Sequence, residues 1–264
     1  MQPHQNALVH QTWFALAIGN SRWHWARFEH DALQATWEEP HRDTKDKLDL
    51  RVLEKLGHLE APIWLASVVP AQTQLWVEFP NVRFLALADV PLLGMYPTFG
   101  LDRALAVCGA IVTGGSPVLV IDCGTALTFT GADAQHRLVG GAILPGLRLQ
   151  FEALGQKTAL LSTLPLSHAP PPPRWALNTE AAIASGVLHT AIAGIQSFIQ
   201  DWWHHFPQSR VVMTGGDSDR LYQGLQQQTP DLAAGINHDP HLIFRGIQAI
   251  KRTSPQGQKE EDQK

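Results

Sequence analysis

A short pattern that occurs twice constrains this chain more than any other feature of its sequence. Residues 16–21 (LAIGNS) and 121–126 (IDCGTA) each contain the end of an apolar strand, a glycine and a small polar residue, and a second alternating strand follows. The two glycines, Gly19 and Gly124, lie 105 residues apart, which is the size of a small domain. The pattern indicates two copies of one unit, although a glycine turn after a strand is also common in unrelated hairpins.

Outside this repeat, apolar runs alternate with stretches of helical periodicity, which predicts an α/β fold. Asn178 or Thr179 is a candidate N-cap for the longest of the helical stretches. The predicted strands are 13–18, 22–28, 63–69, 118–121 and 210–213, and the predicted helices are 102–112 and 178–203.

We divide the chain accordingly into an N-terminal domain, 1–112, and a C-terminal domain, 113–252. Residues 253–264 are polar and charged, which is typical of a disordered tail. The proline run at 170–173 is expected to be an extended surface connection rather than a proline-rich ligand for a partner.

Composition excludes several classes of protein. The 264 residues are 44% hydrophobic and 17% charged, so the chain can bury a core, and collagen-like or wholly disordered proteins are excluded. A net charge of −4 gives no broad basic surface, so we expect no nucleic-acid partner. Cys108 and Cys123 form no paired motif, which fits a reducing cytoplasm. Neither a signal peptide nor a run of about eighteen apolar residues is seen, so we expect no membrane partner.

Three glycine turns that follow strands are candidates for phosphate binding. Backbone N–H groups in such turns can approach an anion closely, and a neighbouring hydroxyl or amide adds a donor. Each turn alone is more simply an ordinary hairpin turn, but three together favour a nucleotide held between two domains. Asp122 directly precedes the second turn, where a carboxylate is suited to a cation that neutralises phosphate charge. The turns are Gly19-Asn20-Ser21, Gly124-Thr125 and Thr214-Gly215-Gly216.

Asp102 and Arg103 open the first predicted helix and form a second candidate site. A carboxylate there can accept a hydroxyl proton, and a guanidinium beside it can clamp an anion with two hydrogen bonds. The alternative is a purely structural role, because aspartate also stabilises the beginning of a helix. Thirteen histidines are scattered without the spacing of a zinc motif, so no histidine metal cluster is expected.

Seven segments, in order along the chain, resemble the motifs of the type III pantothenate kinases. This family belongs to the superfamily of acetate and sugar kinases, heat-shock chaperones and actin, so the resemblance implies two tandem ribonuclease-H-like domains with mixed sheets. It covers nearly the whole chain. The similar segments are GNS at 19–21, ASVVP at 66–70, GLDR at 100–103, DCGTA at 122–126, GGAILPG at 140–146, NTEAAIASG at 178–186 and TGG at 214–216.

The resemblance implies ATP-dependent phosphorylation of pantothenate, the first step of coenzyme A synthesis, by a cytoplasmic homodimer. Asp102 would be the general base that takes the proton of the substrate hydroxyl. Asp122 would hold a monovalent cation, potassium or ammonium, and magnesium would accompany ATP. The other implied site residues are Tyr96, Gly100, Leu101, Arg103 and Thr179 for pantothenate, and Gly19, Asn20, Ser21, Gly124, Thr125, Gly215 and Gly216 for ATP.

This chain departs from the family pattern at three places. The family's first glycine turn follows an aspartate by two residues, and here Ala17 stands at that position. The spacing from Tyr96 to Gly100 is shorter than usual, and residues 157–161 differ from the family's TAxLP segment. Two alternatives therefore stay open at this point: a non-catalytic ATP-binding or regulatory protein on the same fold, and a kinase for another small hydroxylated substrate.

Overall fold

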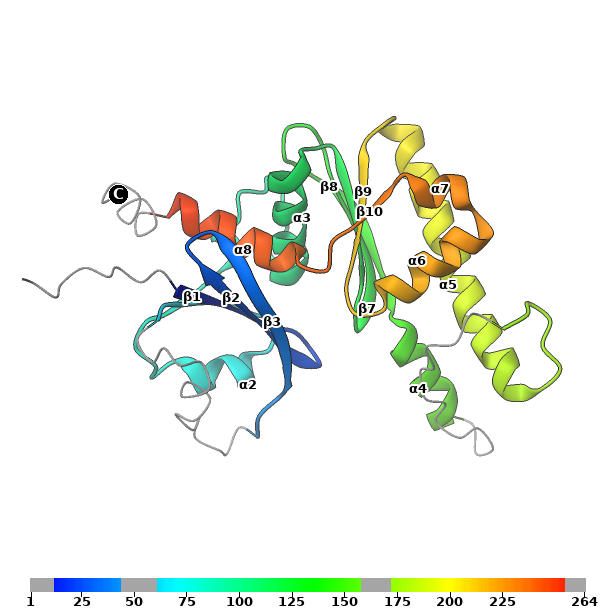
Figure 1. The fold of residues 1–264 in the computed structure, drawn as a ribbon, viewed down its shortest axis with the longest axis horizontal. Helices are drawn as coiled ribbons and strands as arrows, with labels where there is room; N and C mark the ends of the chain where they lie inside the picture. Colours follow the sequence, from blue (N-terminus) through cyan, green and yellow to red (C-terminus); the bar gives the residue numbers. More distant parts are fainter. Residues whose placement is uncertain (1–11, 44–60, 158–171, 255–264) are drawn as a thin grey trace, which may run out of the picture. The chain divides into compact units, whose positions relative to one another are not determined.

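The computed structural model describes residues 12–43, 61–157 and 172–254 (Figure 1). The chain forms two compact units, and the described part of each contains one five-stranded mixed sheet. Unit 1 comprises Met1–Pro91, Tyr96–Gly109 and Ile243–Lys264, and unit 2 comprises Leu92–Met95 and Ala110–Leu242.

The sheet of unit 1 has the order β3-β2-β1-β4-β5. The pairs β1–β2 and β2–β3 are antiparallel, whereas β4 is parallel to β1 and β5 is parallel to β4. Every residue of β1 after Thr12 is buried, which explains its uninterrupted apolar run. The strands are β1 (Thr12–Ile18), β2 (Arg22–Glu29), β3 (Ala32–Pro40), β4 (Ile63–Ser67) and β5 (Val82–Phe84).

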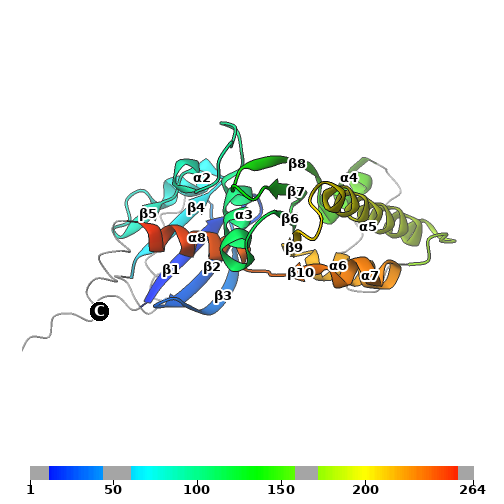
Figure 2. The same ribbon diagram turned by 90° about the horizontal axis from the view of Figure 1, so that it is seen from above.

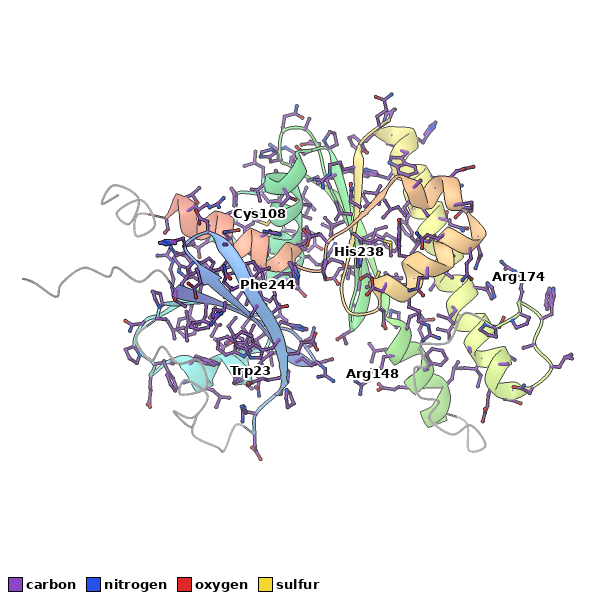
Figure 3. The ribbon with its side chains drawn as sticks, in the orientation of Figure 1. Trp23, Cys108, Arg148, Arg174, His238 and Phe244 are labelled. Carbon is purple, nitrogen blue, oxygen red and sulfur yellow. The ribbon has the colours of Figure 1, made fainter. Side chains whose placement is uncertain are left out.

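One face of this sheet carries an aromatic cluster and is covered by α2 (Pro70–Thr73) and the short 3-10 helix η1 (Gln74–Trp76). The Trp23 indole lies in this cluster and donates a hydrogen bond of 2.9 Å to the Gln72 side chain of α2 (Figure 3). The ring of Trp25 stacks on that of Trp37, with centroids 5.7 Å apart. Large rings therefore fill the side of the sheet that the even-numbered residues of β1 face.

Two helices, α3 (Leu101–Gly114) and α8 (Leu242–Thr253), belong to the opposite face (Figures 1 and 2). The Lys251 ammonium of α8 lies 5.4 Å from the ring centre of Trp13 on β1, and the Gln248 amide donates to the Asp31 carbonyl at 2.7 Å. Gly246 lets α8 approach the backbone of α3, because a Cβ there would collide with the Leu105 carbonyl.

The contiguous division of the chain at residue 112 differs from these units at three places, of which the smallest is residues 110–112, which belong to unit 2. Helix α8 packs on the first sheet although it ends the described chain. Residues 92–95 belong to unit 2, where the Leu93 amide donates to the His136 carbonyl at 2.8 Å. Local sequence patterns identify an amphipathic helix, but they do not say which sheet it covers.

The sheet of unit 2 repeats the same plan, with the order β10-β9-β6-β7-β8. Strands β6, β7 and β8 form an antiparallel meander, β9 is parallel to β6, and β10 is parallel to β9. The strands are β6 (Val118–Cys123), β7 (Ala126–Ala132), β8 (Leu138–Pro145), β9 (Arg210–Thr214) and β10 (Ile236–His238). The helices are α4 (Leu147–Lys157), α5 (Thr179–His205), α6 (Ser218–Gln228) and α7 (Pro230–Ala234).

Helix α5 forms the centre of the core of unit 2. Its N-cap is Asn178, whose side-chain oxygen accepts a hydrogen bond of 2.8 Å from the Ala181 amide, so Asn178 rather than Thr179 is the cap. By length and composition α5 could cross a membrane. Its apolar side, including Ile192, Ile195 and Ile199, packs against the sheet and α6 instead, which accounts for this composition.

The predicted duplication is confirmed by the strand connections. Each unit begins with a three-stranded antiparallel meander whose first strand pairs in parallel with the fourth, and the fifth follows. The predicted α/β class with two tandem mixed-sheet domains therefore holds. Of the run 170–173, residues 170 and 171 lie outside the described residues, as do 255–264 of the predicted tail.

Alanine at Gly246 should destabilise the protein, because the added methyl group would push α8 away from Leu105. Overpacking of this kind costs about 1–3 kcal/mol, which exceeds the gain in helix propensity of about 1 kcal/mol. Gly194 in α5 provides a matched control, since a Cβ there would meet nothing within 4 Å. Urea unfolding should show a lower midpoint for Gly246→Ala and an equal or higher one for Gly194→Ala; equal effects would contradict this packing.

Candidate active site

Asp102 and Arg103 lie in the first turn of α3, in unit 1. An oxygen of the Asp102 carboxylate accepts a hydrogen bond of 2.8 Å from the Arg103 amide. The Arg103 side chain is buried, and its guanidinium lies 4.7 Å from the ring centre of Phe99 and donates to the Tyr96 hydroxyl at 3.3 Å. The aromatic ring and the hydroxyl thus fix a cation beside a carboxylate.

Gly100 makes this geometry possible. A Cβ at residue 100 would lie 2.5 Å from the Asp102 carboxylate oxygen, so a larger residue would displace that side chain. Leu101 begins the helix and is buried, which anchors the turn in the core. The structure therefore brings together five predicted residues: Tyr96, Gly100, Leu101, Asp102 and Arg103.

In unit 2, three glycine segments meet at the carboxyl end of the central strand β6. The turn after β6 is closed by the Gly124 amide, which donates to the Ala126 carbonyl at 3.1 Å. Gly146, which follows β8, donates to the Thr125 carbonyl at 3.0 Å. Gly215, which follows β9, has φ of +91°, and a Cβ there would lie 2.5 Å from the Asp122 carboxylate. Ligands of open α/β sheets bind at such strand ends.

Two carboxylates give this strand end a negative field. Burial raises the pKa of the Cys123 thiol well above its ordinary value, and the nearby charges of Asp122 and Asp217 raise it further. Burial likewise raises the pKa of Asp217, and the Arg220 charge opposes that effect. The Cys123 thiol is therefore protonated and unreactive. The carboxylate oxygens of Asp122 and Asp217 would stabilise a cation bound at this strand end.

The third turn is held by side chains from two elements. The Ser218 hydroxyl of α6 donates to the Gly215 carbonyl at 2.6 Å and accepts from the His238 Nε2 of β10 at 2.7 Å (Figure 3). The Asp217 amide donates to the Cys123 carbonyl at 2.9 Å, so the turn is tied directly to β6. Gly216, the next residue of the turn, has open space beside it, because a Cβ added there would meet no atom within 4 Å.

The first glycine turn, in unit 1, is also held by a backbone hydrogen bond and by a side chain from another segment. The Gly19 amide donates to the Arg22 carbonyl at 3.0 Å, and His41 Nε2 donates to the Gly19 carbonyl at 2.8 Å. Asn20 and Ser21 are exposed at the tip of the turn. Their exposure leaves the turn accessible to an anion.

The predicted residues are divided between the two units. Thr179 is exposed in the first turn of α5, in unit 2. Unit 1 thus holds the predicted base and the first turn, and unit 2 holds the other two turns.

Sequence reasoning missed side chains that support the turns. In the sequence, His41 and His238 show no relation to the turns, because each is about twenty residues from its hydrogen-bond partner, Gly19 for His41 and Ser218 for His238. Asp217 directly follows Gly215-Gly216, so its position in the sequence could have identified it as a carboxylate beside the third glycine turn. Gly146 was recognised as part of a motif, but its close approach to the turn at Thr125 was not.

Comparison with known proteins shows which family this chain is similar to. The family model of type III pantothenate kinase matches residues 13–201. A type III pantothenate kinase of Nostoc sp. is 44% identical over 268 residues, which cover 92% of this chain and 95% of that protein. One of Synechocystis sp. is 44% identical over 239 residues and covers 90% of each chain.

Solved structures show the same fold at low identity. A conserved Campylobacter jejuni protein assigned to the Baf family of transcriptional activators superposes with a TM-score of 0.62 at 20% identity, covering 92% of this chain and 98% of that one. The activator of 2-hydroxyisocaproyl-CoA dehydratase from Clostridium difficile, solved with bound ADPNP, has a TM-score of 0.52 at 10% identity, covering 96% and 98%. These similarities confirm the fold predicted from the repeat.

Alanine at Gly215 should weaken the fold of unit 2. The residue needs a left-handed φ, and the methyl group would press on Asp122 and the Cys123 backbone. Each source of strain costs on the order of 1–3 kcal/mol. Thermal unfolding should show a melting temperature several degrees lower for Gly215→Ala than for Gly216→Ala, whose added methyl group meets nothing within 4 Å. If the two variants melted alike, the crowding described at β6 would be refuted.

Proposed function

The chain belongs to the type III pantothenate kinase family and phosphorylates pantothenate for coenzyme A synthesis, and we propose that the residues described above carry this reaction. The observation that carries the proposal is the pair of Asp102 and Arg103 in one helix turn: the Asp102 carboxylate accepts a hydrogen bond from the Arg103 backbone amide, and the Arg103 side chain is buried. ATP supplies the phosphoryl group together with a divalent metal ion, and pantothenate supplies the accepting hydroxyl.

We assign the general-base role to Asp102. Transfer requires the pantothenate hydroxyl to lose its proton as its oxygen bonds to the γ-phosphorus of ATP, while the bond to the β-γ bridging oxygen breaks and ADP leaves. An aspartate within hydrogen-bond reach of that hydroxyl can take the proton. The Arg103 amide holds the carboxylate in place, and Gly100 leaves room for it.

Arg103 is the proposed anchor for the substrate carboxylate. Pantothenate carries its only charge at the end opposite the reacting hydroxyl, so a fixed cation orients the whole molecule. The guanidinium is held by Phe99 and Tyr96, and a planar, pre-oriented donor suits a carboxylate better than a flexible ammonium. Tyr96 serves in this proposal by positioning Arg103 as well as by lining the substrate site.

The glycine turns are the proposed phosphate sites. In unit 1 they are Gly19, which is half-buried, and the exposed residues Asn20 and Ser21; in unit 2 they include Gly124 and Thr125, which are half-buried. Gly215 and Gly216, on the turn locked by Ser218, are assigned to the nucleotide as well. Backbone N–H groups in such turns bind phosphate oxygens without the flexibility of long side chains.

Asp122 is the proposed site of a monovalent cation, potassium or ammonium. Within the described residues no group of three or more acidic, histidine or cysteine side chains surrounds a possible metal position. A cation held by one or two carboxylates, backbone oxygens and phosphate fits this donor set. When bound, it would offset the negative charge that gathers during phosphoryl transfer.

Thr179 is assigned to substrate across a homodimer interface. Trp175 and Leu177, just before it, are 88% and 102% exposed, which is unusual for large apolar side chains in an isolated chain. Burial of this segment against a second copy would place Thr179 at the interface. We also propose a cytoplasmic location, where pantothenate and ATP are available.

Replacing Asp102 with asparagine should lower kcat by about 10²–10⁴ with little change in folding, because the amide keeps the shape but cannot accept the proton. The matched control is Asp231→Asn, at an exposed aspartate in the first turn of α7. A coupled assay of ADP release at saturating pantothenate measures both. Near-normal turnover by the Asp102 variant would refute the base assignment.

Replacing Arg103 with lysine should raise the KM for pantothenate by about tenfold or more, because a charged hydrogen bond is worth roughly 1.5–3 kcal/mol. The KM for ATP should stay within about twofold. Arg148→Lys is the control, since Arg148 pairs with Glu152 on the exposed side of α4 at 2.7 Å. A change confined to the KM for ATP would show that Arg103 does not hold pantothenate.

A further inference from the structure

The peptide group that joins Gly215 to Gly216 is held by its carbonyl oxygen. This oxygen, which belongs to Gly215, accepts hydrogen bonds from the Ser218 amide at 3.1 Å and from the Ser218 hydroxyl at 2.6 Å. The peptide bond is trans, so its N–H, which belongs to Gly216, points away from the carbonyl oxygen. The two bonds from Ser218 therefore set the direction of the Gly216 N–H.

The Gly216 N–H has space for a ligand. Among the residues that the structure describes, no hydrogen-bond acceptor for this N–H is found. Gly216 is exposed, and a Cβ added to it would meet no atom within 4 Å. A backbone donor whose direction is already fixed binds a ligand at a lower cost in entropy than a mobile donor does.

The direction of the Ser218 hydroxyl depends in turn on His238. A carbonyl oxygen carries no proton, so the hydroxyl proton of Ser218 lies in the bond to Gly215. The Ser218 oxygen can then only accept from the Nε2 of His238, which is 2.7 Å away and must carry a proton. Ser218 is buried, so its oxygen relies on a donor from the protein rather than on bulk water.

Two elements hold the His238 imidazole in this position. His238 lies on β10, where it pairs with Met213 of β9, and the Asp239 amide that follows donates to the Met213 carbonyl at 3.0 Å. The ring of Tyr222 on α6 lies at an angle of 14° to the imidazole, with the ring centres 6.2 Å apart. Strand pairing and ring stacking thus place Nε2 beside Ser218.

We propose that His238 is a positioning residue for ATP: by donating to Ser218, it fixes the peptide group between Gly215 and Gly216 so that the Gly216 N–H is oriented for the nucleotide. This inference rests on the proposed function, which assigns Gly216 to ATP. His238 itself does not contact the nucleotide. It raises the affinity for ATP through Ser218 and contributes nothing to the binding of pantothenate.

The fold depends less on the His238 side chain than the turn does. Strand β10 lies at the edge of its sheet, and its buried residue is Ile236, whereas Asn237 and His238 are exposed. Truncation of an exposed side chain removes little packed apolar surface. Loss of the imidazole should therefore change nucleotide binding more than it changes the free energy of unfolding.

The first test measures affinity in the full-length protein with AMP-PNP, an ATP analogue that is not hydrolysed. His238→Ala should raise the Kd for AMP-PNP in calorimetry, and the KM for ATP, by about three- to tenfold, which is the range for one hydrogen bond. The KM for pantothenate should stay within about twofold. An unchanged Kd, or an equal rise in both KM values, would overturn the proposal.

Three further variants separate the hydrogen bond from the bulk of the side chain. His238→Gln carries an amide that can donate to Ser218, so it should recover most of the affinity. His238→Phe keeps a ring beside Tyr222 without the donor, so it should bind AMP-PNP as weakly as His238→Ala, and it replaces that variant if alanine prevents folding. Asn237→Ala, next to it on β10, is the matched control and should bind like the wild type. Wild-type affinity in His238→Phe would contradict the proposal.

A double-mutant cycle tests whether His238 acts through Ser218. In the Ser218→Ala background the middle group is already lost, so His238→Ala should raise the Kd for AMP-PNP by less than about twofold. Fully additive effects would show that His238 acts by another route and would overturn the proposal.

The amide signal of Gly216 reports on the N–H directly. In isotope-labelled protein, saturating AMP-PNP should move the Gly216 amide proton downfield in the wild type and in Asn237→Ala, because the N–H bonds to the nucleotide. The movement should be markedly smaller in His238→Ala. An equal movement in the wild type and in His238→Ala, or none in the wild type, would refute the proposed orientation.

The outcomes for this inference and for the proposed function are distinguishable. Phosphorylation of pantothenate by the wild type tests the function alone. If the wild type forms phosphopantothenate while His238→Ala and His238→Phe bind AMP-PNP normally, only the role of His238 is refuted. If the wild type forms none but the affinity for AMP-PNP falls as described, the function is refuted and the role of His238 in nucleotide binding holds.

Discussion

The burial of the central strand of each sheet is the constraint on which the rest of the structure depends. Strands β1 and β6 are covered on both faces, so nearly all their side chains must be apolar. Polar side chains are accommodated only near the ends of these strands, where glycine turns let neighbouring segments of the chain approach the strand closely. At β6 this brings Asp122 together with Gly124 and Gly215. The site is thus a consequence of how the core is closed at one edge of the sheet.

The two copies of the unit divide the chemistry between them. Unit 1 carries Asp102 and Arg103 on a helix that packs with α8, and unit 2 carries the carboxylate-flanked turns. Each copy has kept the meander and the parallel fourth strand, whereas residues at the strand ends differ. One such difference is Ala17, which stands on β1 at the position that Asp122 occupies on β6.

Much of this could be predicted from the sequence. The repeat around Gly19 and Gly124 predicted the duplication, and the predicted strands that flank it agree with β1, β2 and β6 within a few residues. Asp102 and Arg103 were identified by their place at the start of a helix. Strands β3 and β10 were not predicted. Six of the nine residues of β3 are exposed and none is buried, and β10 is only three residues long. The packing of α8 on the first sheet depends on contacts between residues distant in sequence.

The central claim is that these residues make an active kinase rather than a protein that only binds ATP. The most direct measurement is the formation of phosphopantothenate by the purified wild type from ATP and pantothenate, with magnesium and with potassium or ammonium, followed by mass spectrometry. The account predicts a product that carries one phosphoryl group and appears in equal amount with ADP. Well-folded protein that binds ATP tightly and forms no phosphopantothenate would contradict it.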